Sequence, residues 1–352
     1  MVSSPDITHP MLRSLITSMI MIILLILSFL ISFSFLSIPE LSPRILSEAD
    51  NNTITKGPAD QNQLSIFVHA IQSSNNSTVL LQLLANSFEN RINEAASLLE
   101  LTSKLPQVRN TQHISSISEE FMGIPENLDL EKRKIAQDIL KQDKNIASIF
   151  FLTPKGDIYI GEPFSDQQQL PRLNFADRDW YKGVTILYDT YLSAVFLSAA
   201  IHIPAVAIAV PVYADNTGNH DDDESFISSP ILGYWVGIVN LNRVKEDIAT
   251  TTTLDFVNSN SSQILLIVDH NGTEVLDIKN SDVYYTSPSS SSSPKTQELK
   301  SFANLESVKN ALNGKSGSTV EVIDSSKATI YYYPVEVLHQ TWAVLLILPF
   351  QP

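Results

Sequence analysis

The feature that most restricts this chain is an uncharged apolar run near its N-terminus. Residues 14–38 read SLITSMIMIILLILSFLISFSFLSI, 25 positions without a charged side chain, and Pro39 follows. As a helix that rises about 1.5 Å per residue, this run is longer than the hydrocarbon core of a membrane, which is about 30 Å thick. A cleaved signal peptide has a shorter apolar core of about 7–15 residues, and Ser32-Phe33-Ser34 is a poor cleavage site. We therefore expect an uncleaved transmembrane anchor, with a cleaved signal peptide and a helix buried in a soluble core as the alternatives.

The charges beside this run indicate its orientation. Arg13 and the α-amino group precede it, partly offset by Asp6, whereas the first charges after it are mostly acidic. The positive-inside rule then places residues 1–13 in the cytoplasm. No other stretch reaches 18 apolar residues without a charge. We therefore expect a single-pass protein of the cell membrane whose bulk, beginning with a polar linker at 39–77, is extracytoplasmic.

The overall composition excludes several classes of function. The chain has 23 Lys and Arg against 38 Asp and Glu, a formal net charge of −15, and no Cys. The missing Cys excludes a disulfide scaffold, a thiolate zinc site and a cysteine nucleophile. The negative charge opposes nucleic-acid binding, which needs a positive field.

Short motifs of catalysis are also missing from the sequence. It contains no G-x-S-x-G, no G-x-x-x-x-G-K-[ST], no G-x-G-x-x-G and no H-E-x-x-H, and its seven His show no metal-ligand spacing. His220 beside the acidic run 221–224 could bind a hard cation, although such loop runs are usually only solvated. His202, in the stretch AAIHIPAV, is interpreted as a core residue, with a ligand-binding group as the alternative. We expect neither an enzyme nor a metal site nor a cofactor.

A long amphipathic helix is predicted after the linker. Six apolar residues follow one another at intervals of three or four and form one stripe: Leu81, Leu84, Phe88, Ile92, Ala95 and Leu99. This spacing predicts a helix over 77–104, which Pro106 stops. The stripe packs either on the domain of its own chain or against a second copy, since the same spacing forms coiled-coil seams. A second helix is predicted at 130–142.

The remaining sequence repeats one order of elements. Hairpins are predicted at 146–160 and 264–278, because two β-rich runs flank a Gly-containing turn in each. A short helix or turn at 179–182 and a strand at 191–197 follow the first hairpin, and a helix at 299–313 and a strand at 319–323 follow the second. Each half then has a strand containing Pro-Val and a strand that starts at Trp: 207–214 and 235–241, then 330–337 and 342–348. Helices separate from antiparallel sheets predict an α+β fold, with a helical segment at 78–143 and modules at 144–256 and 257–352.

An ordered set of motifs marks a resemblance. DRDWYK at 177–182, YLS at 191–193, PAVAIAVPVYADNTG at 204–218 and GYWVGIVNLNRV at 233–244 follow one another. Over about 78–350 the chain resembles the double Cache (dCache) extracytoplasmic sensor domains of chemoreceptors and sensor kinases. The resemblance implies two PAS-like modules after a long helix, the membrane-distal one binding a small metabolite and the membrane-proximal one following it.

The resemblance nominates pocket residues. The R-x-W-Y motif of the family corresponds to Arg178, Trp180 and Tyr181, and a later pocket aromatic corresponds to Tyr191. A guanidinium offers a planar fork of donors to a carboxylate, and Trp and Tyr supply apolar walls. The alternative is that Trp180 and Tyr181 are core residues that close the helix on the sheet.

Two departures from the family pattern bear on the ligand. Leu173 stands where the amino-acid-binding version has Tyr, and Ile238 stands where it has a carboxylate. Asn240 lies two residues further, on the same strand face. Without the acid a buried ammonium lacks its charge partner, so we expect a carboxylate or neutral ligand rather than a plain amino acid, with Asn240 among the contacts.

The expected function is therefore that of a membrane-anchored small-molecule sensor. Because the sequence reaches Pro352 soon after the last predicted strand, we expect signalling through a separate partner. A homodimer through the long helix is a further expectation. A surface-tethered solute-binding or adhesive module without a signalling role is the alternative, and an extracytoplasmic enzyme is the third hypothesis.

Overall fold

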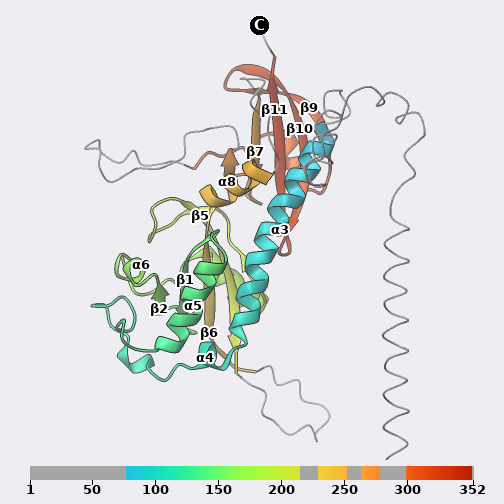
Figure 1. Cartoon of the computed structure of the whole chain (residues 1–352). Helices are drawn as coiled ribbons and strands as arrows, with labels where there is room; N and C mark the ends of the chain where they lie inside the picture. Colours follow the sequence, from blue (N-terminus) through green and yellow to red (C-terminus); the bar gives the residue numbers. More distant parts are fainter. Residues whose placement is uncertain (1–76, 215–228, 252–262, 278–298, 351–352) are drawn as a thin grey trace, which may run out of the picture. The chain divides into compact units, whose positions relative to one another are not determined.

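The structure, a computed structural model, describes residues 77–214, 229–251, 263–277 and 299–350 (Figure 1). These residues belong to one compact unit that spans 59–352. The expected anchor, almost all of the polar linker and the acidic run beside His220 lie outside the described residues. Of the helices in the described ranges, none combines the length and the apolar character needed to cross a bilayer.

The long helix α3, Ser77–Ser103, forms where the apolar spacing predicts it. All six residues of the stripe are buried within this chain, and α3 contacts strands of both sheets. The interpretation that the stripe packs on its own domain is therefore confirmed. A homodimer through α3 stays a prediction, and it would need another face of the helix.

The first module is an antiparallel sheet in the order β2-β1-β6-β5-β3, with β4 paired to β5. Before it come α4 (Pro106–Arg109) and the 3-10 helix η1 (Ile114–Ser116). Its own elements are α5 Leu130–Gln142, β1 Ile146–Leu152, β2 Ile158–Glu162, α6 Phe164–Gln168, α7 Asp179–Leu187, β3 Tyr191–Leu192, β4 Phe196–Leu197, β5 Pro204–Tyr213 and β6 Ile231–Asn240. In the middle of the sheet Gly237 of β6 lies opposite Ile149 of β1 and Ile208 of β5.

The second module repeats this plan in the order β8-β7-β11-β10-β9. The helix α8, Leu241–Thr251, precedes it. Its elements are β7 Ile264–Val268, β8 Glu274–Asp277, α10 Glu306–Leu312, β9 Gly317–Ile323, β10 Ser326–Val337 and β11 Gln340–Pro349. The α+β class with two antiparallel sheets is thus confirmed for the described residues.

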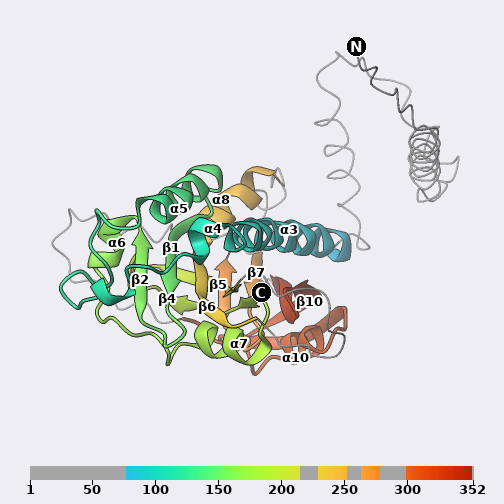
Figure 2. The same ribbon diagram turned by 90° about the horizontal axis from the view of Figure 1, so that it is seen from below.

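Both faces of the sheets are covered. Side chains alternate along β5, so that Val206 and Ile208 join the core beneath α3 while Ala205 and Ala207 face the other side. Figure 2 shows α3, α5 and α8 on one side of the sheets and α7 and α10 on the other. The candidate site lies on the α7 side of the first sheet.

Three local predictions are wrong. The strand expected at 191–197 is two short strands, because the Ala194 and Val195 amides donate to carboxylates instead of to β5. The helix expected at 299–313 begins only at Glu306, because the backbone of residues 300–302 bonds β8 and its turn. His202, interpreted as a core residue, is exposed and has a φ of 55°.

The repeat extends to individual hydrogen bonds in the two hairpin turns. In the first turn the Thr153 amide donates to Asp157 O and the Gly156 amide to Thr153 O. In the second turn Asp269, Gly272 and Thr273 occupy the corresponding places and form the same two bonds. Because Gly156 and Gly272 have φ values of 87° and 74°, both turns need the conformational freedom of glycine at this position.

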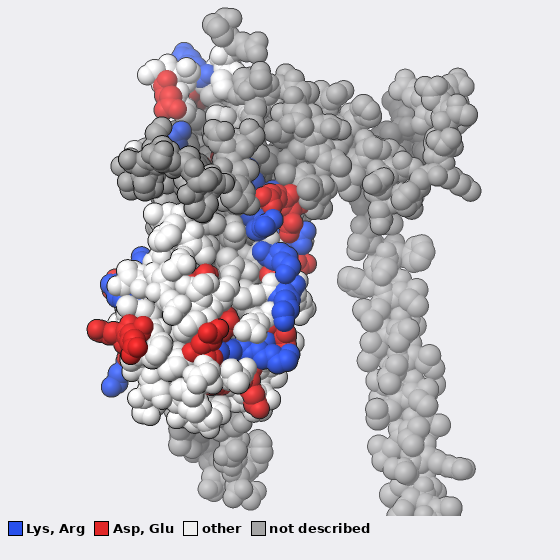
Figure 3. Space-filling model, turned by 60° about the vertical axis from the view of Figure 1, so that its left-hand side comes forward, with Lys and Arg blue, Asp and Glu red and all other residues white. Residues whose placement is uncertain are grey.

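Charges of both signs are mixed on the described surface. On the face drawn in Figure 3, Lys and Arg lie beside Asp and Glu, and broad uncharged areas separate them. Several described cations pair with an acid one helical turn away, such as Lys134 with Asp138 at 2.5 Å and Arg243 with Glu246 at 3.0 Å. In Figure 3 most of the Lys and Arg groups follow one another along one edge of the described surface, with Asp and Glu beside them.

Candidate functional site

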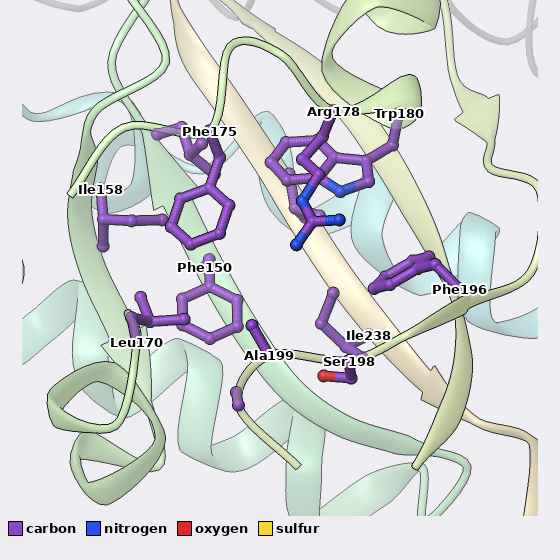
Figure 4. Close-up of a pocket in the computed structure, with 13 residues that line it drawn as sticks. Phe150, Ile158, Leu170, Phe175, Arg178, Trp180, Phe196, Ser198, Ala199 and Ile238 are labelled. Atoms are coloured by element: carbon purple, nitrogen blue, oxygen red, sulfur yellow. The ribbon is translucent and has the colours of Figure 1, made fainter. Parts of the chain in front are cut away.

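A small apolar pocket lies between the first sheet and α7. Its floor is formed by β1 and β6, which contribute Phe150 and Ile238, and its walls include Phe175, Trp180 and Phe196 (Figure 4). The cavity measures about 30 Å³, room for about two water molecules. A larger ligand therefore needs one of the walls to move.

Arg178 brings the only charge among the 13 residues that line this pocket. It is the N-cap residue of α7, in an extended conformation with φ −71° and ψ 148°. This conformation directs its half-buried side chain inward, so that the guanidinium points into the pocket centre in Figure 4. Its carbon lies 5.9 Å from the ring centres of both Phe175 and Phe196.

Within the described residues, the guanidinium of Arg178 donates no hydrogen bond and forms no ion pair, although, after the hydrogen bond from Arg172, its charge is among the causes that lower the pKa of the neighbouring Asp177. The neighbouring Asp177 carboxylate is exposed and bonds Arg172 at 2.5 Å, and this bond is the main reason why the pKa of Asp177 is lowered. A half-buried cation beside apolar walls that donates no hydrogen bond is costly, and an anion with planar acceptor geometry would relieve that cost.

The internal repeat shows that this cation is specific to the first module. Arg178 N–H bonds Phe175 O and its carbonyl accepts from Lys182 N–H, while Leu305 forms the same pair of bonds with Phe302 and Lys309 at the start of α10. Leu305 thus replaces Arg178 in the second module. A side chain that can bind an anion is therefore present at the start of α7 in the first module and absent from the equivalent position at the start of α10.

A family comparison agrees with this architecture. The family model described as a Cache domain, dCache, matches residues 65–351. The chain belongs to the dCache family. No curated protein sequence matches this dCache chain.

Solved structures of similar fold are bacterial ligand-binding domains. That of the chemoreceptor PctB from Pseudomonas aeruginosa PAO1, in complex with L-Gln, has 17% identity and a TM-score of 0.48 over 76% of this chain and 87% of that one. That of PctC from the same organism, with GABA, has 18% identity and a TM-score of 0.47 over 78% and 98%. That of CtaA from Pseudomonas fluorescens, with L-isoleucine, has 12% identity and a TM-score of 0.47 over 82% and 95%. At these values the likeness carries no information about the ligand of this dCache chain.

Trp180 lies where both interpretations place it. Its side chain is 6% exposed and belongs to the core on the α7 side, and it also lines the pocket. Together with Arg178 it is one of two predicted site residues that the dCache fold brings to this cavity.

Tyr181 does not line the pocket. Its hydroxyl donates to Pro154 O at 2.7 Å, and its ring lies edge-on to Tyr234 with 5.3 Å between ring centres. Burial raises the pKa of Tyr181. The residue holds α7 to the β1–β2 turn, and direct ligand contact by Tyr181 stays a prediction.

Tyr191 also lies beside the pocket and not in its lining. Its hydroxyl donates to Asp179 Oδ1 at 3.1 Å. Burial, followed by the Asp179 charge, raises the pKa of Tyr191 to about 12. The other oxygen of Asp179 accepts the Ala194 amide at 2.9 Å, so Tyr191 belongs to a hydrogen-bonded support of the chain next to the pocket.

Asn240 lies at the end of β6, where its side chain accepts hydrogen bonds from the first turn of α8. Its Oδ1 accepts the Asn242 amide at 3.0 Å and the Arg243 amide at 3.4 Å. Ile238, two residues earlier, does line the pocket. Ligand contact by Asn240 stays a prediction that this geometry does not support.

Sequence reasoning missed Phe175, Phe196 and Ser198, which all line the cavity. Phe175 stands three residues before Arg178 and is repeated as Phe302, so the internal repeat was a signal for it. Phe196 lies in the two-residue strand β4 and Ser198 follows it directly, and so short a segment has no periodicity that marks a pocket wall. Within the described residues, no group of His, Asp and Glu is arranged to hold a metal ion.

Proposed function

We propose that this dCache chain is an extracytoplasmic sensor that binds a small carboxylate in the first-module pocket. The observation that supports this proposal is the unpaired Arg178 guanidinium, directed into an apolar cavity. The proposed mechanism is binding without catalysis. The ligand carboxylate accepts hydrogen bonds from Arg178, and its apolar body lies among Phe150, Phe196 and Ile238.

The lining favours a ligand with one negative charge and little else that is polar. Besides Arg178, the polar groups among the lining side chains are the Ser198 hydroxyl and the indole N–H of Trp180. No Asp or Glu is among the lining residues, so an ammonium group on the ligand would have no counter-charge there. We therefore expect a carboxylic acid without an amino group to bind more tightly than the amino acid of the same carbon skeleton.

The bias against a plain amino acid has no support from the similar domains, whose named ligands include L-Gln, GABA and L-isoleucine. Each acid is therefore tested beside its amino counterpart: butyrate beside GABA, and 3-methylpentanoate beside L-isoleucine. Titration calorimetry of the full chain in detergent gives both affinities. Tighter binding of the amino member in both pairs would contradict the charge argument.

The role of Arg178 is tested with the same titrations. Arg178→Met keeps the length and apolar character of the side chain and removes the donors. Because hydrogen bonds to a charged group contribute about 1.5–3 kcal/mol, we expect butyrate affinity to fall about 10- to 100-fold. Arg243→Met removes an exposed arginine of α8 that pairs with Glu246, and it serves as the matched control. Equal butyrate affinities of the wild type and Arg178→Met would contradict the proposal.

The remaining parts of the proposal concern the whole chain. We infer that residues 14–38 anchor it with residues 1–13 in the cytoplasm, and that the sensor modules extend over 144–256 and 257–352 after a helical segment at 78–143. Signalling then passes to a separate partner in the membrane. Protease treatment of intact and permeabilised cells tests the orientation, since digestion of the sensor modules only after permeabilisation would contradict it.

A further inference from the structure

A carboxylate of the second module reaches the chain that forms the ligand pocket. Asp269, in the β7–β8 turn, is fully buried. Its Oδ1 accepts the amides of Asn271 and Thr273, both at 2.9 Å, within its own turn. Its Oδ2 accepts the amide of Val195 in the first module at 3.0 Å. One oxygen therefore serves the turn and the other joins the two modules.

The first module contains a natural comparison for this residue. Thr153 occupies the corresponding place in the β1–β2 turn, and its single hydroxyl oxygen accepts the amides of Lys155 and Asp157 at 3.3 and 3.2 Å. One side-chain oxygen is thus enough to form this turn. The second oxygen of Asp269 is not needed locally, and the structure uses it for Val195.

The segment that Asp269 holds carries a wall of the pocket. We call residues 193–203, between β3 and β5, the strap. Phe196 and Ser198 of the strap line the cavity, and the adjacent Ala194 amide is held by Asp179, the neighbour of Arg178. The cavity is too small for a four-carbon acid as it stands, so binding requires displacement of a wall. The strap contains the two-residue strand β4, which pairs with β5. The two amides before β4, those of Ala194 and Val195, are held by side chains, one from each module.

We propose that Asp269 is a positioning residue of the ligand pocket, acting across the module boundary through Val195 and the strap. Without Asp269 the buried Val195 amide would lose the one acceptor that the described residues give it, and the wall would be held less firmly. A ligand that shifts the strap then changes the same bond, so binding at Arg178 and the conformation of the β7–β8 turn are coupled. The coupling rests on the proposed function, whereas the positioning of the strap does not.

The first test needs no ligand. Asp269→Thr copies Thr153, so it keeps the turn and removes the bond to Val195, and Asp269→Asn is a second variant that keeps the side-chain shape. We expect the amides of residues 194–198 in the full chain to exchange with deuterium at least 10-fold faster in both variants, while Asn271 and Thr273 remain protected. Glu321→Gln is the control, because Glu321 accepts the Glu306 and Ser307 amides in the same module without touching the strap. Strap exchange as slow as in the wild type, or accelerated equally in the control, would overturn the proposal.

The second test adds sodium butyrate. We expect its affinity to fall about 3- to 10-fold in Asp269→Thr and to stay unchanged in Glu321→Gln. In the wild type, butyrate should also alter exchange at residues 270–273, and this response should vanish in Asp269→Thr. Unchanged affinity together with an unchanged turn response would refute the coupling. If neither the wild type nor the variants bind butyrate, the proposed function is contradicted for this ligand. The hydrogen-exchange result alone then decides whether Asp269 positions the strap.

Discussion

At the scale of single residues, the pocket cation has a stability consequence of its own. Arg178 is half-buried beside two phenylalanine rings and forms no hydrogen bond or ion pair with a described residue. Replacing such a charge by an apolar side chain of similar volume is often neutral or stabilising. We expect Arg178→Met to leave the free energy of unfolding of the ligand-free protein unchanged or raised by up to about 1 kcal/mol, as urea denaturation measures. A loss above about 1 kcal/mol would show that the guanidinium is paired in the folded protein.

A second cation is fully buried on the α3 side of the first sheet. Lys132 Nζ lies 3.2 Å from Asp129 and about 4 Å from the ring centres of Phe151 and Tyr159. Burial outweighs the attraction of Asp129 and lowers the pKa of Lys132 from 10.5 to about 8. Between these values the unfolded chain holds the proton and the folded chain does not, so stability rises with pH.

This sign gives a pH prediction. From pH 7 to pH 9.5 the wild type should gain about 1–2 kcal/mol of unfolding free energy relative to Lys132→Met, because each unit of pKa difference is worth about 1.4 kcal/mol. Urea denaturation at the two pH values measures it. Tyrosine ionisation occurs in both proteins and cancels in the comparison. A difference that is constant or falls with pH would contradict the lowered pKa.

At the scale of elements, α3 is held by its buried stripe. Phe88 is fully buried and lies against Trp342 of β11, with 5.5 Å between ring centres. Truncation of a buried phenylalanine to alanine costs about 3–5 kcal/mol, so we expect that loss for Phe88→Ala in urea denaturation. Leu101→Ala, at a position of α3 that is 67% exposed, should cost less than about 0.5 kcal/mol.

The same helix gives a prediction about self-association. Because the stripe is used inside the chain, Phe88→Ala should leave the sedimentation coefficient of the folded protein unchanged. A change in oligomeric state with Phe88→Ala would instead support the alternative that the stripe packs against a second copy of the chain. A surface substitution such as Leu83→Asp tests the exposed side of α3, where Leu83 is 42% exposed.

At the scale of the whole molecule, the two modules share one core. The cluster beneath α3 includes Trp235 and Val239 of the first sheet and Trp342 and Val344 of the second. Two sheets that bury apolar side chains against one helix should lose protection together. We expect β6 and β11 to become exchangeable at the same urea concentration in pulse-labelling hydrogen exchange. Loss of protection in β11 at a clearly lower concentration would show independent modules.

Much of the fold could be predicted because its signals are local. The spacing of α3, the hairpin turns with Gly156 and Gly272, and the Pro-Val and Trp strands each depend on neighbours within a few residues. The predicted boundaries of elements were wrong where the backbone forms hydrogen bonds to a distant segment, as at residues 299–305, which were predicted as helix. The exposed, left-handed His202 is a failure of the same kind, because the strap that carries it is shaped by tertiary bonds.

The candidate site also has a part that local sequence signals predict and a part that depends on tertiary contacts. The motif of Arg178 and Trp180 is readable from one short stretch, since an N-cap and the turn after it are set by adjacent residues. Which aromatic rings face the cavity depends on the pleat of strands far apart in sequence, and this is why Tyr181 and Tyr191 turn out to support the pocket wall instead of lining it.

The amino-acid order alone was sufficient for the two repeated modules, the long helix, the dCache resemblance and the cation of the first module. Only the tertiary structure showed that this cation forms no hydrogen bond or ion pair with a described residue and that Leu305 replaces it in the second module. It also showed that Asp269 reaches Val195, 74 residues away. The physical reason is that periodicity and turn chemistry are properties of adjacent residues, whereas an unpaired charge and a shared hydrogen bond are properties of groups that meet only when the chain is folded.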